Sequence, residues 1–174
     1  MIRAAAEGDV EAITGIYSHH VLHGTASFET TPPDVAEMTR RYRALRDQDY
    51  PYLAAEADGT VVGYAYAGPY RPRIAYQYTV EDSIYIRVDQ TGRGIGSRLL
   101  TALIKACEQR DYRQMIAVVG DSASLASIAL HERHGFHRIG TLRSVGRKHG
   151  SWLDSVLLQR TLGNGDTAPP SVAT

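Results

Sequence analysis

The sequence predicts an α/β fold, and three patterns support this prediction. A β-branched run, Ile84–Val88, passes through three glycines into an amphipathic helical pattern that starts near Ile95. A continuous apolar run, Met115–Val119, is typical of a strand buried in a parallel part of a sheet. Asp58–Gly59 stands between two strand-like runs, which is a strong signal for an antiparallel hairpin. We therefore expect a sheet with parallel and antiparallel neighbours, covered by helices.

Length and composition narrow the class of protein further. The 174 residues fit one domain, which we expect to span residues 1–162. Because 19 basic residues balance 19 acidic ones, nothing indicates a general nucleic-acid or anionic-membrane binder. The single cysteine, Cys107, excludes an internal disulfide and continues an apolar helix face. The chain has no signal-peptide pattern and no apolar stretch of membrane-spanning length, which favours a cytoplasmic protein.

The N-terminal third is predicted to form an edge strand, two helices and a hairpin. Met1–Ala5 is the strand, and Asp9 is placed to cap the first helix. Thr31 is placed to cap the second helix, with Asp34 closing a capping box. The two strands joined by the hairpin turn are Tyr52–Ala57 and Thr60–Ala67.

The rest of the chain alternates between strand and helix patterns. Residues 76–88 have a period of two, as in one long strand, but Asp82 interrupts its apolar face. A carboxylate there is costly unless a β-bulge turns it outward, and bulges are frequent at functional places. The later elements are a helix over residues 124–134 and two closing strands over residues 136–142 and 152–162, separated by a basic segment. Residues 163–174 are rich in Gly, Pro, Ala and Thr, so we expect them to be disordered.

Three histidines near the end of the first helix raise the possibility of a metal site. His19 and His23 have the i,i+4 spacing of helical metal ligands, and His20 lies between them. No acidic or cysteine partner stands near them in the sequence. We therefore predict solvated or packing histidines and no metal.

The glycine loop Gly92–Gly96 is the first functional signal. Bare glycines let successive backbone N–H groups turn toward one point, and the start of the next helix adds unpaired N–H groups and a positive dipole end. The loop fits neither the dinucleotide pattern Gly-x-Gly-x-x-Gly nor the P-loop, because Ser97 or Leu99 takes the third glycine position and no Gly-Lys-Ser/Thr follows. A phosphate cradle is one interpretation, and a merely tight strand-to-helix turn is the other.

Several separated motifs together resemble the GNAT superfamily of N-acetyltransferases. The glycine loop Thr91–Gly96 and the segment Ser127–Phe136, which ends in Gly-Phe after a helix, are similar to two signatures of that superfamily. Tyr66–Arg73, Ala75–Glu81 and Gly140–Asp154 narrow the resemblance to the phosphinothricin and methionine sulfoximine or sulfone acetyltransferases. The resemblance runs from about residue 2 to residue 162. It implies a mixed, mostly antiparallel sheet of about seven strands with about four flanking helices, and a homodimer.

The resemblance also implies acetyl-CoA as the cosubstrate, with the strand continuation hydrogen-bonding pantetheine and the glycine loop holding pyrophosphate. The implied cofactor-binding residues are Ile84, Tyr85, Ile86, Gly92, Arg93, Gly94, Ile95, Gly96, Ser97 and Ser124. Two positions depart from the family pattern. Thr91 stands where Gln or Arg is usual, which backbone binding tolerates, and Ser124 replaces an Asn whose amide would reach the pantetheine arm.

The catalytic roles follow from the same resemblance. Glu81 holds the position of the general base, against the alternative of a surface glutamate on a half-exposed strand. His131 stands where many relatives carry the tyrosine that protonates the departing thiolate, and a packing histidine is an equal alternative. Tyr85 is the second candidate for that proton donor.

The implied substrate is a small amino-acid-like amine with an anionic group. Arg71 and Arg73 on a proline-stiffened loop suit a carboxylate or phosphinate, while Phe28, Tyr76 and Glu81 complete the expected acceptor site. Two rivals stay open: a peptide or protein N-terminal acetyltransferase, and a CoA-binding sensor without catalysis.

Overall fold

The computed structural model describes residues 1–170 and contains a seven-stranded sheet with strand order β1-β2-β3-β4-β5-β7-β6. The strands are β1 Ile2–Ala4, β2 Tyr52–Ala57, β3 Thr60–Pro69, β4 Thr79–Ile86, β5 Gln114–Gly120, β6 His137–Lys148 and β7 Ser151–Thr161. The β4–β5 pair is parallel and every other pair is antiparallel. The predicted mixed, mostly antiparallel sheet is therefore confirmed.

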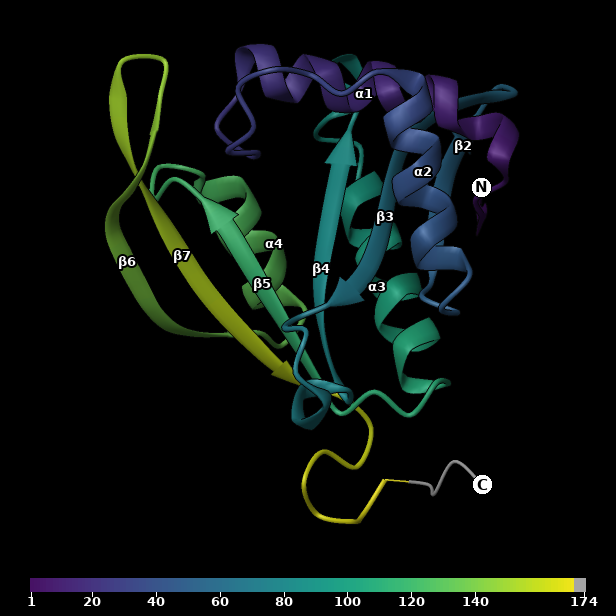
Figure 1. Ribbon diagram of the computed structural model, residues 1–174, viewed down its shortest axis with the longest axis vertical. Helices are drawn as coiled ribbons and strands as arrows, with labels where there is room; N and C mark the ends of the chain where they lie inside the picture. Colours follow the sequence, from purple (N-terminus) through teal and green to yellow (C-terminus); the bar gives the residue numbers. More distant parts are fainter. Residues whose placement is uncertain (171–174) are drawn as a thin grey trace.

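Within the described residues, four α-helices cover the two faces of this sheet (Figure 1). They are α1 Val10–His23, α2 Val35–Arg46, α3 Ile95–Glu108 and α4 Leu125–Arg133. The apolar sides of α1 and α2 pack on one face around a group of tyrosines, including Tyr52, Tyr64 and Tyr85. The apolar sides of α3 and α4 pack on the other face, with the stripe from Ile95 to Cys107 almost fully buried. Because successive side chains of a strand point to opposite faces of the sheet, β2 and β3 contribute residues to both cores.

The feature that positions the site is a split between β4 and β5. Their parallel pairing runs only from Thr79–Gln114 to Asp82–Ala117. Beyond that point Ser83–Ile86 and Val118–Gly120 separate, and the two arrowheads point apart in Figure 1. Since β4 remains paired with β3 through Ile86, its edge toward β5 is the one that lacks a neighbouring strand among residues 1–170. The split leaves backbone groups free to bind a ligand.

Several local predictions are corrected by the structure. The expected strand over residues 76–88 is β4 alone, because short 3-10 turns at Ile74–Tyr76 and Val88–Gln90 stand on either side of it. Helix α2 starts at Val35, so Asp34 is its N-cap and accepts from the Glu37 backbone N–H, and the expected cap at Thr31 is wrong. Asp9 makes no side-chain cap to α1; its carboxylate accepts from the Ala6 backbone N–H and pairs with Arg3 instead.

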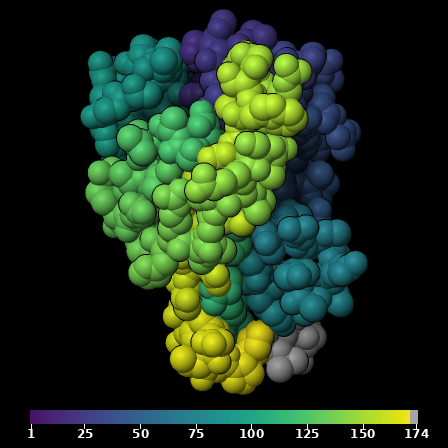
Figure 2. All heavy atoms as spheres, turned by 90° about the vertical axis from the view of Figure 1, so that its left-hand side faces the viewer, coloured from purple at the N-terminus to yellow at the C-terminus, as the bar shows by residue number. Residues whose placement is uncertain are grey.

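The closing hairpin β6–β7 is longer than predicted. The basic segment over residues 143–150, expected to separate two strands, is mostly part of β6, and register shifts after Arg138 and Leu142 let the strand bend. Figure 2 shows the hairpin, in yellow-green, lying against the N-terminal part of the chain, in purple and blue. There the Lys148 ammonium donates to the Ser27 carbonyl oxygen at 2.6 Å. The hairpin thus extends over one end of the β4–β5 split.

The residues after β7 follow defined turns as far as the structure describes them. Arg113, which is buried, donates to the carbonyl oxygens of Gly165 and Pro169 at 3.3 and 3.0 Å. These acceptors fix residues 163–170, for which composition predicts disorder, and the remaining residues 171–174 lie outside the described part. Among residues 1–170, no helix combines the length and apolar character needed to cross a bilayer.

Candidate active site

A cavity of about 880 Å³ occupies the split between β4 and β5. One of its ends is lined by the glycine loop and the first turn of α3, and its floor by the diverging strands. Its other end is lined by Ser27, Phe28 and Tyr66. Glu81, Asp82 and His131 line it where the strands part. The structure therefore joins the glycine loop and the proposed catalytic residues in one continuous cavity.

The glycine loop forms the expected helix N-terminus. Gly92 and Gly94 have φ angles of 75° and 73°, which are strained for any residue with a Cβ, and Gly94 is the N-cap of the 14-residue helix α3. Gly96 faces α4, where a Cβ would lie 3.3 Å from the Leu130 side chain. Gly92, Gly94, Ile95, Gly96 and Ser97 line the cavity, whereas Arg93 is exposed and does not. The unpaired N–H groups at this helix start suit a phosphate group.

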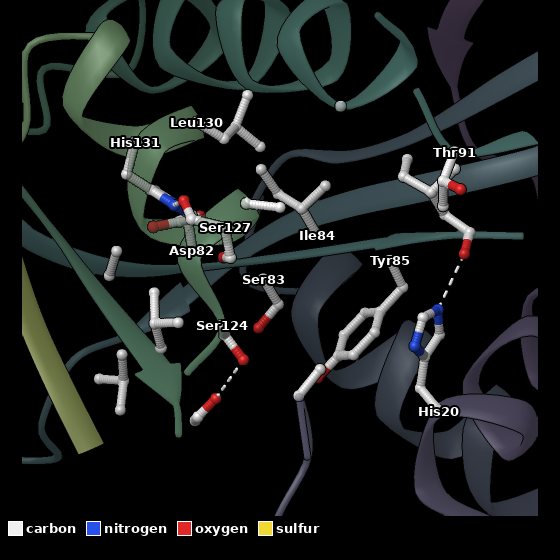
Figure 3. Close-up of a pocket in the computed structure, with 18 of the residues that line it drawn as sticks. His20, Asp82, Ser83, Ile84, Tyr85, Thr91, Ser124, Ser127, Leu130 and His131 are labelled. Carbon is white, nitrogen blue, oxygen red and sulfur yellow. Dashed lines mark hydrogen bonds and ion pairs between the residues drawn. The ribbon is translucent and has the colours of Figure 1, made fainter. Parts of the chain in front are cut away.

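The two positions that depart from the family pattern both line this cavity. The Thr91 hydroxyl donates to the Val88 carbonyl oxygen at 3.0 Å, so it stabilises its own turn. The Ser124 hydroxyl donates to the Gly120 carbonyl oxygen at 2.8 Å, which ties the start of α4 to the end of β5 (Figure 3). Neither hydroxyl proton is free in this structure.

The free edge of β4 carries Ile84, Tyr85 and Ile86, all of which line the cavity. His20 from α1 bonds to the Ile86 carbonyl oxygen at 2.8 Å and so occupies one acceptor at the end of this edge (Figure 3). Tyr85 is buried, with its ring against those of Tyr17 and Tyr64. Burial raises the pKa of Tyr85 well above its ordinary value, so its hydroxyl stays protonated.

Glu81 lies where β4 and β5 are still paired, opposite Ile116 of β5 and Gly68 of β3. Its side chain is half-buried and lines the cavity. Burial raises the pKa of Glu81, the negative charge of Asp82 raises it further, and Arg71 opposes both effects. A carboxylate with a raised pKa in a cavity has the character of a general base.

Asp82 lies on the interior side of β4, and no bulge turns it outward. The β3–β4 and β4–β5 registers run through it without a shift. Its carboxylate is instead buried and pairs with His131 from α4, with 3.1 Å between Asp82 Oδ2 and His131 Nε2 (Figure 3). This pairing offsets the cost of burying the carboxylate. His131 is therefore partnered and buried at the edge of the cavity.

At the end of the cavity lined by Ser27 and Phe28, distant segments of the chain contact one another. Phe28 packs against Gly146 and Gly120, where added Cβ atoms would lie 2.3 and 3.0 Å from ring carbons of Phe28. The Lys148–Ser27 hydrogen bond ties the same loop to the same hairpin. We call Ser27, Phe28, Gly146 and Lys148 the Phe28 clamp.

The remaining predicted substrate residues are not brought to the cavity lining. Arg71, Arg73 and Tyr76 are exposed on the loop before β4. Arg71 lies 5.2 Å over the ring of Tyr70 and is close enough for its charge to act on Glu81, while Tyr76 packs edge-on against Tyr70. In this structure Arg71 alone of the three has a described electrostatic link to the site.

Sequence reasoning missed three side chains of this site. The sequence marks Asp82 only as a charge on an apolar strand face, His20 only as a member of a histidine group, and Lys148 only as part of a basic segment. An unexplained charge on the apolar face of a strand was the one signal available. Within residues 1–170 the structure contains no group of three His, Cys, Asp or Glu residues that could hold a metal.

The chain is similar over most of its length to proteins of known class. Residues 15–136 match the acetyltransferase (GNAT) family. A phosphinothricin N-acetyltransferase from Alcaligenes faecalis is 53% identical over 169 residues, which cover 97% of this chain and 86% of that protein. An L-methionine sulfoximine/L-methionine sulfone acetyltransferase from Pseudomonas paraeruginosa is 40% identical, with 97% and 98% covered.

A solved structure extends the likeness to three dimensions. The crystal structure of a GNAT superfamily phosphinothricin acetyltransferase from Sinorhizobium meliloti, in complex with acetyl-CoA, has a TM-score of 0.97 to this chain. It is 44% identical in sequence, and the match covers 99% of this chain and 94% of that one. Family match, full-length relatives and fold agree: the chain belongs to the acetyltransferase (GNAT) family.

Proposed function

We propose that this protein moves the acetyl group of acetyl-CoA to the α-amine of a small amino-acid-like compound, of the phosphinothricin, methionine sulfoximine or methionine sulfone type. The observation that carries the proposal is the β4–β5 split, which has an anion-binding helix start at one end and Glu81 where the strands part. The names of the full-length relatives support the choice of substrate class.

The residues fit acetyl-CoA as the donor substrate. The N–H groups at Gly94–Gly96 suit the pyrophosphate, and the free edge of β4 over Ile84–Ile86 suits the amide groups of the pantetheine arm. Ser124 lines the opposite wall. The cavity runs without a break from this cradle to Glu81, so a bound thioester reaches the carboxylate that prepares the amine.

The roles of the catalytic side chains follow from their surroundings. Glu81, with its raised pKa, accepts the proton of the substrate ammonium directly or through water. The neutral amine then attacks the thioester carbonyl carbon, and a backbone N–H of the free β4 edge is placed to stabilise the negative oxygen. For the final proton to sulfur we favour His131 over Tyr85, because the Tyr85 ring is packed within the tyrosine cluster.

We take the end of the cavity lined by Ser27, Phe28 and Tyr66 as the acceptor end, and its contacts favour a compact substrate over a peptide. The Phe28 clamp connects the α1–α2 loop to the β6–β7 hairpin across that end of the cavity. Arg71, through its proximity to Glu81, is our candidate for binding the anionic group. We retain Arg73 and Tyr76 as weaker candidates that need a movement of their loop.

A thiol-release assay with acetyl-CoA tests the proposal. The acceptors are phosphinothricin, methionine sulfoximine, methionine sulfone, ordinary amino acids, polyamines and short peptides. We expect turnover to be greatest on the amino-acid analogues. Turnover on peptides alone would identify an N-terminal acetyltransferase, and binding of acetyl-CoA without turnover on any amine would identify a sensor; either result contradicts the proposal.

We further propose that the protein acts in the cytoplasm as a homodimer. Its one cysteine is buried and unpaired, which suits a reducing compartment. The long edge strand β6 and its hairpin expose the apolar side chains of Ile139, Leu142, Val145 and Trp152, which a second copy would cover. Light scattering that gives the mass of a single chain at micromolar concentration would contradict the dimer.

A further inference from the structure

The two ring nitrogens of His131 both face oxygen atoms. Nδ1 lies 2.8 Å from the Ser127 carbonyl oxygen, and Nε2 lies 3.1 Å from Asp82 Oδ2. A carbonyl oxygen only accepts, so Nδ1 must carry a proton. The contact with Asp82 needs a second proton between nitrogen and oxygen. The pair therefore holds either an imidazolium with a carboxylate or a neutral imidazole with a carboxylic acid.

The surroundings of the pair favour the charged form. Asp82 Oδ1 is buried and has no hydrogen-bond partner among residues 1–170, which leaves His131 as the one cation paired with this carboxylate. Burial alone lowers the pKa of His131, but the hydrogen bond and charge of Asp82 and the Ser127 carbonyl oxygen raise it above its ordinary value.

Among the other described neighbours of the pair, Glu81 is the one that brings a charge. The Phe136 ring packs edge-on against the imidazole, and Ile128 fills the same side of α4. On α3, burial and the negative charge of Asp82 together raise the pKa of the Cys107 thiol to about 12, so the thiol stays neutral. Glu132 and Arg133, next in α4, are exposed. Glu81 is the remaining ionisable group that interacts with Asp82, from the next position of β4.

The pair also lies at the point where chemistry is expected. Asp82 is the last residue of β4 that is in register with β5, so the split opens directly beyond it. Both Asp82 and His131 line the cavity. In Figure 3 the two side chains point toward one another beside Ser83 and Ile84, the start of the free edge.

We propose that Asp82 is a positioning residue that holds His131 in its doubly protonated form, ready to deliver the Nε2 proton to the departing CoA thiolate. This role rests on the proposed acetyl transfer. As the carbon–sulfur bond breaks, its electron pair goes to sulfur, which takes the proton as the Nε2–H bond breaks. A neutral imidazole remains, still donating from Nδ1 to Ser127. The proton that Glu81 removed from the ammonium restores the charge through water.

Asp82→Asn is the matched variant, because it keeps the shape and a hydrogen bond but reverses its direction. The amide donates to a bare Nε2, so His131 becomes neutral while α4 stays attached to β4. In ¹⁵N spectra near neutral pH, we expect both ring nitrogens of His131 to be protonated in the wild-type protein and one in Asp82→Asn. The ring signals that disappear in His131→Gln are those of His131. The wild-type spectrum decides the protonation state even if the variant fails to fold.

Kinetics then separate a proton donor from a merely structural pair. We expect Asp82→Asn to lower kcat by about 10²-fold, the lower end of a general acid's contribution, with an unchanged Kd for acetyl-CoA. His131→Gln should lose a similar factor, and the double variant little more than either, because the two residues act as one unit.

Three results would overturn the proposal: a single ring proton on wild-type His131, an unchanged kcat in Asp82→Asn, or fully additive losses. A wild-type protein that acetylates no amine contradicts the proposed function and the proton delivery together. The ¹⁵N spectra, which need no turnover, would still show whether Asp82 holds the charge.

Discussion

The two ends of the cavity are built in different ways. The donor end consists of backbone: a strand edge, a glycine loop and a helix start that follow one another along the chain from Ser83 to Ser97. The acceptor end consists of side chains from distant segments, with Phe28 against Gly146 and Lys148 against Ser27. A donor shared by a whole family suits a backbone site, whereas side-chain contacts can change with the acceptor. The two ends meet at Glu81.

The largest expected effect comes from the residue where the two ends meet. Glu81→Gln keeps the shape but cannot accept a proton, so we expect kcat to fall by about 10²–10⁴-fold. The Kd of acetyl-CoA, measured by calorimetry, should stay unchanged. Glu11→Gln, an exposed position on α1, is the control and should turn over normally. Full turnover of Glu81→Gln with saturating substrates would remove Glu81 from the mechanism.

Gly146→Ala should weaken binding of the acceptor without affecting binding of acetyl-CoA. The new Cβ would lie 2.3 Å from a ring carbon of Phe28, so the ring or the hairpin must move. Overpacking of this kind typically costs about 1–3 kcal/mol, which corresponds to a roughly 5- to 150-fold rise in the acceptor KM if the clamp opens to relieve it. The Kd of acetyl-CoA should not change.

Two further variants check this interpretation. Gly140→Ala changes the same strand where nothing lies within 4 Å of the added Cβ, so it should behave like the wild-type protein. In a Phe28→Ala background, Gly146→Ala should have little further effect, because its partner is absent. An equal rise of KM from Gly140→Ala would show that strand flexibility, rather than the Phe28 contact, matters.

Gly94→Ala should weaken binding of acetyl-CoA without affecting binding of the acceptor. The φ angle of Gly94 is 73°, and a left-handed conformation costs a residue with a Cβ about 1–2 kcal/mol. We therefore expect the Kd of acetyl-CoA to rise by roughly 5- to 30-fold, while the acceptor KM at saturating acetyl-CoA stays the same. A changed acceptor KM would mean that the two ends are coupled.

The smallest effect is expected at Thr91. Its hydroxyl bonds to the Val88 carbonyl oxygen within its own turn, so backbone groups are left to bind the phosphate. Thr91→Val should change the Kd of acetyl-CoA by less than about twofold, since a hydrogen bond at an exposed turn contributes little net free energy. A tenfold loss, measured by the same titration, would give the Thr91 side chain a direct role in binding.

The same contrast explains what the sequence could predict. The glycine loop, the Asp58–Gly59 hairpin and the strand that carries Glu81 depend on residues close together in sequence, so local patterns were sufficient. Asp82 and His131 are 49 residues apart, and Lys148 bonds to a carbonyl 121 residues away. Sequence periodicity does not reveal such distant partners. The pattern therefore marks the Asp82 carboxylate as costly, but it does not show that His131, rather than a bulge, accommodates it.

The two arginines assigned to substrate binding, Arg71 and Arg73, also show what the sequence cannot predict. The resemblance to a family assigned Arg71 and Arg73 to the acceptor, but both are exposed on the loop before β4 and outside the cavity lining. Their side chains are held by few local contacts. Whether these arginines bind the substrate depends on the position of the loop when substrate is bound. A sequence motif does not specify that position.

The pH dependence of kcat for the wild-type protein and Glu81→Gln tests the central claim most directly. A neutral amine is needed for attack, and in the proposed mechanism Glu81 supplies it by removing a proton at pH values below the pKa of the amine. The account predicts that Glu81→Gln is most defective between the raised pKa of Glu81 and the pKa of the amine, and approaches wild-type kcat as the pH rises toward the pKa of the amine. A deficit that stays constant across the pH range would contradict Glu81 as the base.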